Sequence, residues 1–193
     1  MKENRNVIIG LGLLLLALVA TYHLYTAERR HQQSLEEASR HRLDIESSVL
    51  ERSGSPQFEV QLYFYRPGAV VPGPDFLVAE KRLVFHTNDT LLMARQIVND
   101  LLAGPMKENA RIFSDQARLR QVYLLEGGTI VVDLSKETAK QLIGGVITEL
   151  TALHSISRSL IENVGQIKQV KFLVDGHEQP TFAGHVSILE PFM

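Results

Sequence analysis

Apolar and polar positions divide the chain into three parts. Residues 7–25 carry no formal charge and are almost wholly apolar, and a helix of about 19 residues spans roughly the hydrocarbon core of a bilayer. Residues 26–56 are charged, with scattered apolar positions, and end at a Ser-Gly-Ser-Pro break. Residues 57–193 alternate between strand-like and helix-like patterns. The chain is therefore predicted to contain a transmembrane anchor (7–25), a helical, polar stalk (26–56) and one folded domain (57–193).

Within 57–193 the periodicity changes between two and 3.6 residues, which predicts strands and helices in turn. Alternation at 58–65 places Phe58, Val60, Leu62 and Phe64 on one face of a strand. The predicted elements are strands at 58–65 and 76–85, a helix from 88–90 to 104–105, strands at 119–125 and 129–134 around a two-residue Gly-Gly turn, a helix from 144–145 to 165, and strands at 167–174 and 185–189. The order β-β-α-β-β-α-β-β predicts a compact α+β domain.

The apolar segment has two interpretations, an uncleaved anchor and a cleaved signal peptide. A cleavage site needs small residues at positions −3 and −1. Cutting after Ala20 places Leu18 at −3, and cutting after Ala27 places Tyr25 there. Neither site fits, so we predict a single-pass anchor.

Charges beside the anchor indicate its orientation. Lys2 and Arg5 precede it, against Glu3 alone. The positive-inside rule predicts a cytoplasmic stub (1–6) and an extracytoplasmic domain, although Arg29 and Arg30 weaken the bias.

Composition excludes several function classes. The formal net charge of −2 argues against nucleic-acid binding, which needs a concentrated basic face. The chain has no Cys, which removes disulfides, thiolate nucleophiles, Cys-based metal sites and a lipid-modified N-terminal cysteine.

No motif for a nucleophile elbow, a phosphate-binding loop or a zinc protease helix is present. One cluster contains Asp175, His177, Glu178 and His185 near the C-terminus. Two His and a carboxylate can bind Zn²⁺, but an ordinary polar loop explains the same residues, and their spacing matches no short metal motif. We therefore predict no catalytic, cofactor-binding or metal-binding residues, no cofactor and no enzymatic activity.

Other polar and aromatic residues have structural interpretations. His154 is predicted at the border of a helix's apolar face, and Ser135 as a cap of the following turn, not as the partner of Asp133 in a catalytic dyad. Tyr63 and Tyr65 form either an exposed aromatic pair or a surface covered by a helix or a neighbouring strand.

An ordered set of segments resembles the GerM domain family, the sporulation and spore germination domain also called GerMN. Ser159-Leu160 stands where the family often has Thr-Leu. The matching segments are LYFY (62–65), LVAEKRLV (77–84), LLAGP (101–105), TIVVDLS (129–135), ITELTALHSISRSLIE (147–162), QVKFLVDG (169–176) and ILEPF (188–192).

The resemblance implies an extracytoplasmic α+β module behind a membrane or lipid anchor, related in fold to ring-building domains and without a known enzymatic activity. It does not imply a role in sporulation. The leading hypothesis is a structural or interaction module that assembles with itself or with an envelope protein, through the edges of strand 76–85 and of the short last strand. The alternative is a cell-wall-related hydrolase or ligand-binding protein that uses the His177/His185 loop.

Overall fold

The computed structural model describes residues 56–66, 76–142 and 145–193, together with the isolated positions 18, 21, 22, 25, 26, 49 and 54. The predicted stub (1–6) lies outside the described residues. The same holds for the anchor (7–25) and the stalk (26–56), apart from those isolated positions and Pro56. The four described positions of the anchor are helical. Among the residues that are described, no helix is both long and apolar enough to cross a membrane.

The folded domain contains five strands, three α-helices and a 3-10 turn among its described residues. In chain order they are β1 (Gln57–Tyr65), β2 (Leu77–Phe85), α2 (Thr90–Ala103), β3 (Leu119–Leu125), η2 (Glu126–Gly128), β4 (Thr129–Leu134), α3 (Lys136–Lys140), α4 (Gly145–Asn163) and β5 (Gln169–Val174).

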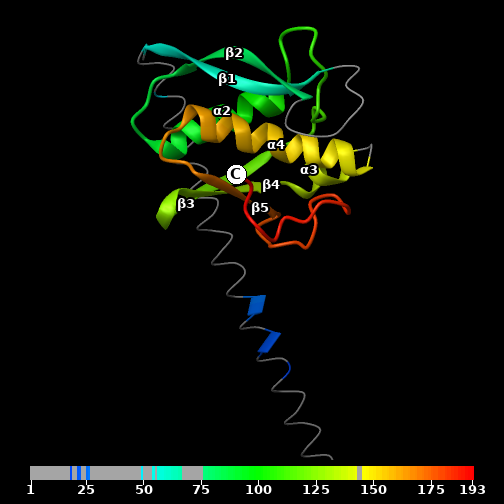
Figure 1. Cartoon of the computed structure of the whole chain (residues 1–193). Coiled ribbons are helices and arrows are strands. Elements are labelled where there is room, and N and C mark those ends of the chain that lie inside the picture. Colours follow the sequence, from blue (N-terminus) through cyan, green and yellow to red (C-terminus); the bar gives the residue numbers. More distant parts are fainter. Residues whose placement is uncertain are drawn as a thin grey trace, which may run out of the picture. The chain divides into compact units, whose positions relative to one another are not determined.

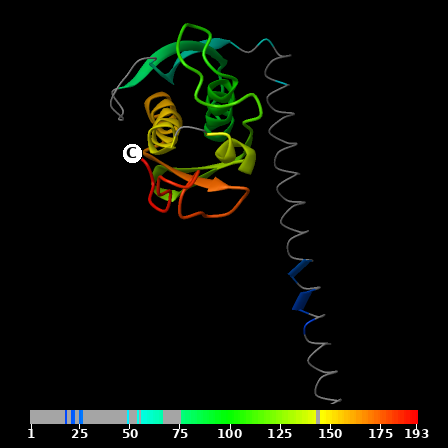
Figure 2. The same cartoon turned by 90° about the vertical axis from the view of Figure 1, so that its right-hand side faces the viewer.

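These elements form three layers. β1 and β2 make an antiparallel hairpin, and β3, β4 and β5 make a mixed sheet in which β4 pairs antiparallel with β3 and parallel with β5. Figures 1 and 2 show α2 and α4 in the layer between the two sheets. Apolar side chains of all three layers form one core, and Val60, Leu62 and Phe64 belong to it as predicted. The α+β prediction is confirmed.

Capping residues define α2 at both ends. The Asp89 carboxylate accepts the N–H groups of Leu91 (2.8 Å) and Leu92 (3.1 Å), which satisfies two of the unpaired donors of the first turn. Gly104 ends the helix with φ 97°, a conformation that favours glycine. The predicted helix boundaries are thus confirmed by their caps.

Polar side chains of α4 close the outer edge of β1. Ser159 Oγ accepts the Tyr63 N–H (3.0 Å), and Ser155 Oγ donates to the Tyr63 carbonyl. The Asn163 amide accepts from Gln61 N (2.9 Å) and donates to Gln61 O (2.7 Å). These three α4 residues recur every four positions and share one helix face. That face occupies the backbone groups of β1 with which a third strand would otherwise pair.

Tyr63 lies under α4, so the covered interpretation of the tyrosine pair is correct for it. Its side chain is only 4% exposed, and the Arg158 guanidinium lies 4.3 Å from its ring centroid. Its hydroxyl donates to Glu162. Burial and the neighbouring Glu162 carboxylate raise the pKa of Tyr63.

The strand predicted at 185–189 is wrong. This segment forms only an isolated bridge, Thr181 to Ser187. The physical reason is that the Glu149 carboxylate takes the backbone N–H groups of His185 (3.0 Å) and Val186 (2.9 Å), and a ladder cannot use donors that are already occupied.

Two turns also differ from prediction. The β3–β4 connection has three residues, η2, instead of two, although Gly127 (φ 80°) and Gly128 (φ 86°) both have the expected positive φ. Ser135 caps the segment that follows it, as predicted, but that segment continues into the short helix α3.

The strand β5 begins at Gln169, later than predicted, because the Ile167 N–H is hydrogen-bonded to the Val164 carbonyl.

His154 gives the folded state a dependence on acid. It packs edge-to-face against Phe192, with 5.5 Å between ring centroids, at the border of the apolar face as predicted. Burial lowers the pKa of His154, so the unfolded chain takes up a proton first as the pH falls below about 6.5. The contribution of His154 to the free energy of unfolding is therefore fully present above that pH and declines below it. We expect His154→Leu to reduce the fall in unfolding free energy between pH 7 and pH 5, measured by urea denaturation at each pH. Equal falls in both proteins would contradict this.

Candidate functional site

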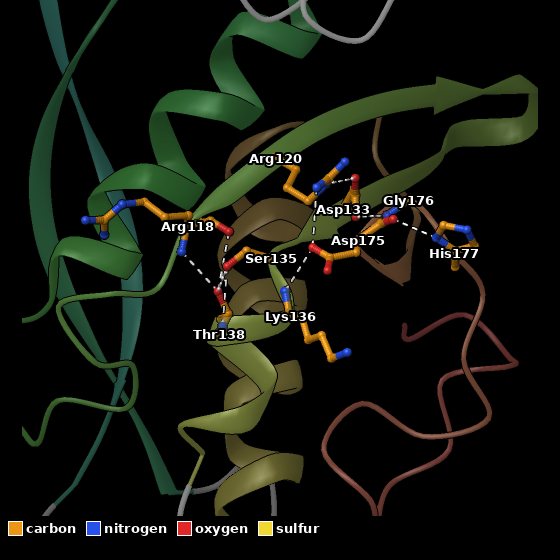
Figure 3. A network of polar contacts seen from close by, with 9 residues as sticks. All are labelled: Arg118, Arg120, Asp133, Ser135, Lys136, Thr138, Asp175, Gly176 and His177. Carbon is orange, nitrogen blue, oxygen red and sulfur yellow. Dashed lines mark hydrogen bonds and ion pairs between the residues drawn. The ribbon is translucent and has the colours of Figure 1, made fainter. Parts of the chain in front are cut away.

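A network of polar groups around the buried Asp133 lies where the parallel strands β4 and β5 end (Figure 3). Asp133 of β4 is fully buried. Its Oδ2 accepts from Arg120 Nε (2.9 Å) and its Oδ1 from Gly176 N (2.8 Å). A register shift between Leu119 and Gln121 in β3 leaves Arg120 outside the regular ladder, and such bulges redirect side chains.

Asp175 extends the network to the start of α3. It has φ 52°, a left-handed conformation that Asp tolerates. Its Oδ1 accepts from Lys136 N (3.1 Å) and from Arg120 Nη1 (3.3 Å). Arg120 therefore joins two carboxylates, and the segments that follow β4 and β5 are held together.

Ser135 has its own partners in this network. Its Oγ lies 3.0 Å from Thr138 Oγ1 and accepts from Thr138 N. Thr138 Oγ1 in turn accepts the Arg118 N–H (3.0 Å). These partners of Ser135 are those of a capped turn.

A cavity of about 550 Å³ opens beside the network, a size typical of small-molecule sites. α3 forms one wall, residues 179–184 form the opposite wall, and the end of β5 contributes the base. The lining residues are Lys136, Ala139, Lys140, Leu142, Val174, Asp175, His177, Gln179, Thr181, Phe182, Ala183 and Gly184.

The four residues of the predicted polar cluster do not converge on one point. His177 Nδ1 lies 2.7 Å from the Asp175 carbonyl oxygen, and Glu178 pairs with Lys171. His185 Nδ1 lies 3.1 Å from Glu149 Oε2, and His185 does not line the cavity, whereas His177 does. In the described ranges, no three His, Asp or Glu side chains are grouped so as to hold a metal ion.

Glu149 holds residues 183–186, which overlap the end of the wall formed by residues 179–184, and sequence reasoning missed it. It is 1% exposed and accepts the N–H groups of Ala183 (2.7 Å), His185 (3.0 Å) and Val186 (2.9 Å). The available signal was a lone acidic residue within the apolar stripe of α4. Its role depends on a loop more than 30 positions later in the chain, which periodicity does not reveal.

Comparisons with known proteins identify relatives of this domain. A family model described as "Germane: Sporulation and spore germination" matches residues 61–180. The first GerMN domain of the sporulation protein GerM from Bacillus subtilis is similar at 17% identity and a TM-score of 0.54, over 70% of this chain and 96% of that one. The tandem GerMN domains of the same protein are similar at 17% identity and a TM-score of 0.54, over 70% of this chain and 45% of that one. A comparison with curated proteins gave no match.

Proposed function

Because the chain belongs to the Germane (GerMN) family of sporulation and spore germination domains, we propose that it is a membrane-anchored, extracytoplasmic interaction module. It associates with itself or with another protein of the cell envelope. The observation that supports this most is the order of its parts: a family domain at 61–180 follows an uncharged apolar segment long enough to span a bilayer.

The outer edge of β2 is the proposed contact surface. The hydrogen bonds from His86 N to Pro56 O and from Arg66 N to Phe76 O show that the even-numbered residues form the hydrogen-bonded pairs across the hairpin. The backbone N–H and C=O groups of Ala79, Lys81 and Leu83 therefore point outward. At the end of this edge, the backbone N–H and C=O groups of Phe85 are both hydrogen-bonded to the side-chain amide of Gln96 in α2. No backbone partner for the other three occurs within the described ranges. Because α4 closes the edge of β1, an added strand would pair with β2.

Proline at position 81 tests this edge. It removes an outward N–H and leaves the hairpin bonds in place, a position that edge strands tolerate. We expect Lys81→Pro to abolish crosslinking of the full-length protein in membranes, whereas the matched control Lys81→Thr, which keeps the N–H, still crosslinks. Equal crosslinking of the two variants would exclude the β2 edge, and a full-length protein that never crosslinks to any protein would contradict the interaction module.

We also propose that the module is not an enzyme. The carboxylates of Asp133 and Glu149 are occupied by structural hydrogen bonds, which leaves them unsuited to proton transfer. The full-length protein is expected to release no soluble fragments from peptidoglycan. Release that disappears in a His177→Ala, His185→Ala variant would instead support the hydrolase.

A further inference from the structure

The cavity beside α3 has a cationic wall formed by two lysine side chains. Lys136 and Lys140 are four positions apart and line the cavity from one face of α3. Neither ammonium group has an ion-pair partner among the described residues, whereas Lys81 and Lys171 pair with Glu59 and Glu178. In Figure 3 the Lys136 side chain runs away from Asp175.

The other titratable groups of the lining do not cancel this charge. Among the described lining residues Asp175 is the only carboxylate, and it is engaged by Arg120 and by the Lys136 backbone N–H. His177 Nδ1 faces a carbonyl oxygen, which can only accept, so Nδ1 carries the hydrogen and Nε2 remains for another group.

The wall opposite the lysines combines apolar and polar contacts. Phe182, 4% exposed because its ring belongs to the core, contributes a small apolar surface to the lining, while Gln179 and Thr181 offer an amide and a hydroxyl. The Glu149 carboxylate holds the end of this wall through the Ala183 N–H, and it holds the residues just beyond through the N–H groups of His185 and Val186, so a ligand need not order this end.

We propose that this cavity is a binding site for an oxyanion, a carboxylate or a phosphate, carried on a small molecule or chain end with an apolar part. Lys136 and Lys140 bind the oxyanion, and the apolar part packs on Phe182 and Leu142. Ammonium groups bind oxyanions through charge-assisted hydrogen bonds, and the cavity volume of about 550 Å³ fits such a molecule. The site does not rest on the interaction with an envelope partner.

Titration calorimetry of the full-length protein in detergent micelles tests the site with two probes. Phenyl phosphate represents the phosphate source, and N-acetyl-D-alanyl-D-alanine represents the carboxylate source. We expect saturable binding of at least one probe, weakened by added salt, and which probe binds identifies the source. If neither probe shows saturable binding at concentrations up to about 10 mM, the proposal is overturned.

Matched lysine variants locate the binding. Lys136→Gln, Lys140→Gln is expected to weaken binding by roughly tenfold for each lysine removed, with an unchanged circular dichroism spectrum. The control Lys107→Gln, Lys168→Gln removes the same charge from exposed positions outside the lining and is expected to bind as the unaltered protein does. Equal losses in the two double variants would mean a general charge effect and would overturn the site, whichever partner the module has.

Discussion

Glu149→Ala is expected to lower the free energy of unfolding by about 3–5 kcal/mol. The substitution leaves the N–H groups of Ala183, His185 and Val186 without their acceptor, and these residues follow the buried Phe182 in the chain. A buried donor without a partner costs about 1–3 kcal/mol. These three donors are only partly buried and share one carboxylate, so the three losses do not add in full.

Urea denaturation of the full-length protein in detergent measures the effect. Glu149→Gln is expected to be intermediate, because an amide keeps one acceptor oxygen but turns an NH₂ group toward a donor. Glu190→Ala serves as the control, since Glu190 is exposed in the same C-terminal segment and such changes stay within about 0.5 kcal/mol. If Glu149→Ala and Glu190→Ala unfold alike, Glu149 does not hold the wall.

Glu80→Ala is the second large effect, again about 3–5 kcal/mol. Glu80 and Arg82 are 1% and 7% exposed, and their side chains pair at 2.8 Å. Glu80 also accepts from Met106 N (2.8 Å) and Asn109 Nδ2 (3.1 Å), and Arg82 donates to the Gly104 carbonyl. Removing Glu80 leaves a buried guanidinium without its counter-ion and frees the segment after α2.

The double variant Glu80→Met, Arg82→Met separates charge from packing. Replacing both members of a buried pair by apolar groups is often close to neutral, so the double variant is expected to be more stable than Glu80→Ala in the same urea experiment. If the double variant loses as much or more, the loss reflects packing and not an uncompensated charge.

Acid titration gives an independent reading of Glu80. Burial alone would raise the pKa of Glu80, but hydrogen bonds from Met106, Arg82, Asn109 and Lys107 outweigh burial and hold the pKa below its usual value. The stabilisation is therefore present above about pH 4.3, the ordinary pKa of Glu, and is lost as the pH falls through the lower pKa of the folded state. In Glu80→Gln, this part of the acid loss is expected to be absent.

Local pattern predicted most of the secondary structure because its signals lie within single segments. Alternation identified β1, and the Asp89 cap and the Gly104 C-cap identified α2. The predicted last strand failed because Glu149, 36 positions before His185, takes its donors. That competition is tertiary, and no window around 185–189 contains it.

The candidate site was less predictable than the fold. Sequence reasoning selected His177, which lines the cavity, but grouped it with His185, which does not. The sequence did not indicate a role for Lys136 and Lys140, because lysines are common on exposed helices. Only the folded structure shows that α3 lies opposite residues 179–184. The buried charges of β2 were visible in the sequence, because Glu80 and Arg82 interrupt the apolar positions on the buried face of this strand.

The sidedness of the membrane tests the proposed function most directly. The chain has no Cys, so one introduced cysteine is the only thiol it can carry. Met193, 89% exposed, and Glu3, in the predicted cytoplasmic stub, are suitable positions. With a membrane-impermeant maleimide on cells whose cytoplasmic membrane is intact, Met193→Cys should label at once and Glu3→Cys only after permeabilisation. Labelling in the opposite order would place the domain in the cytoplasm and contradict an extracytoplasmic module.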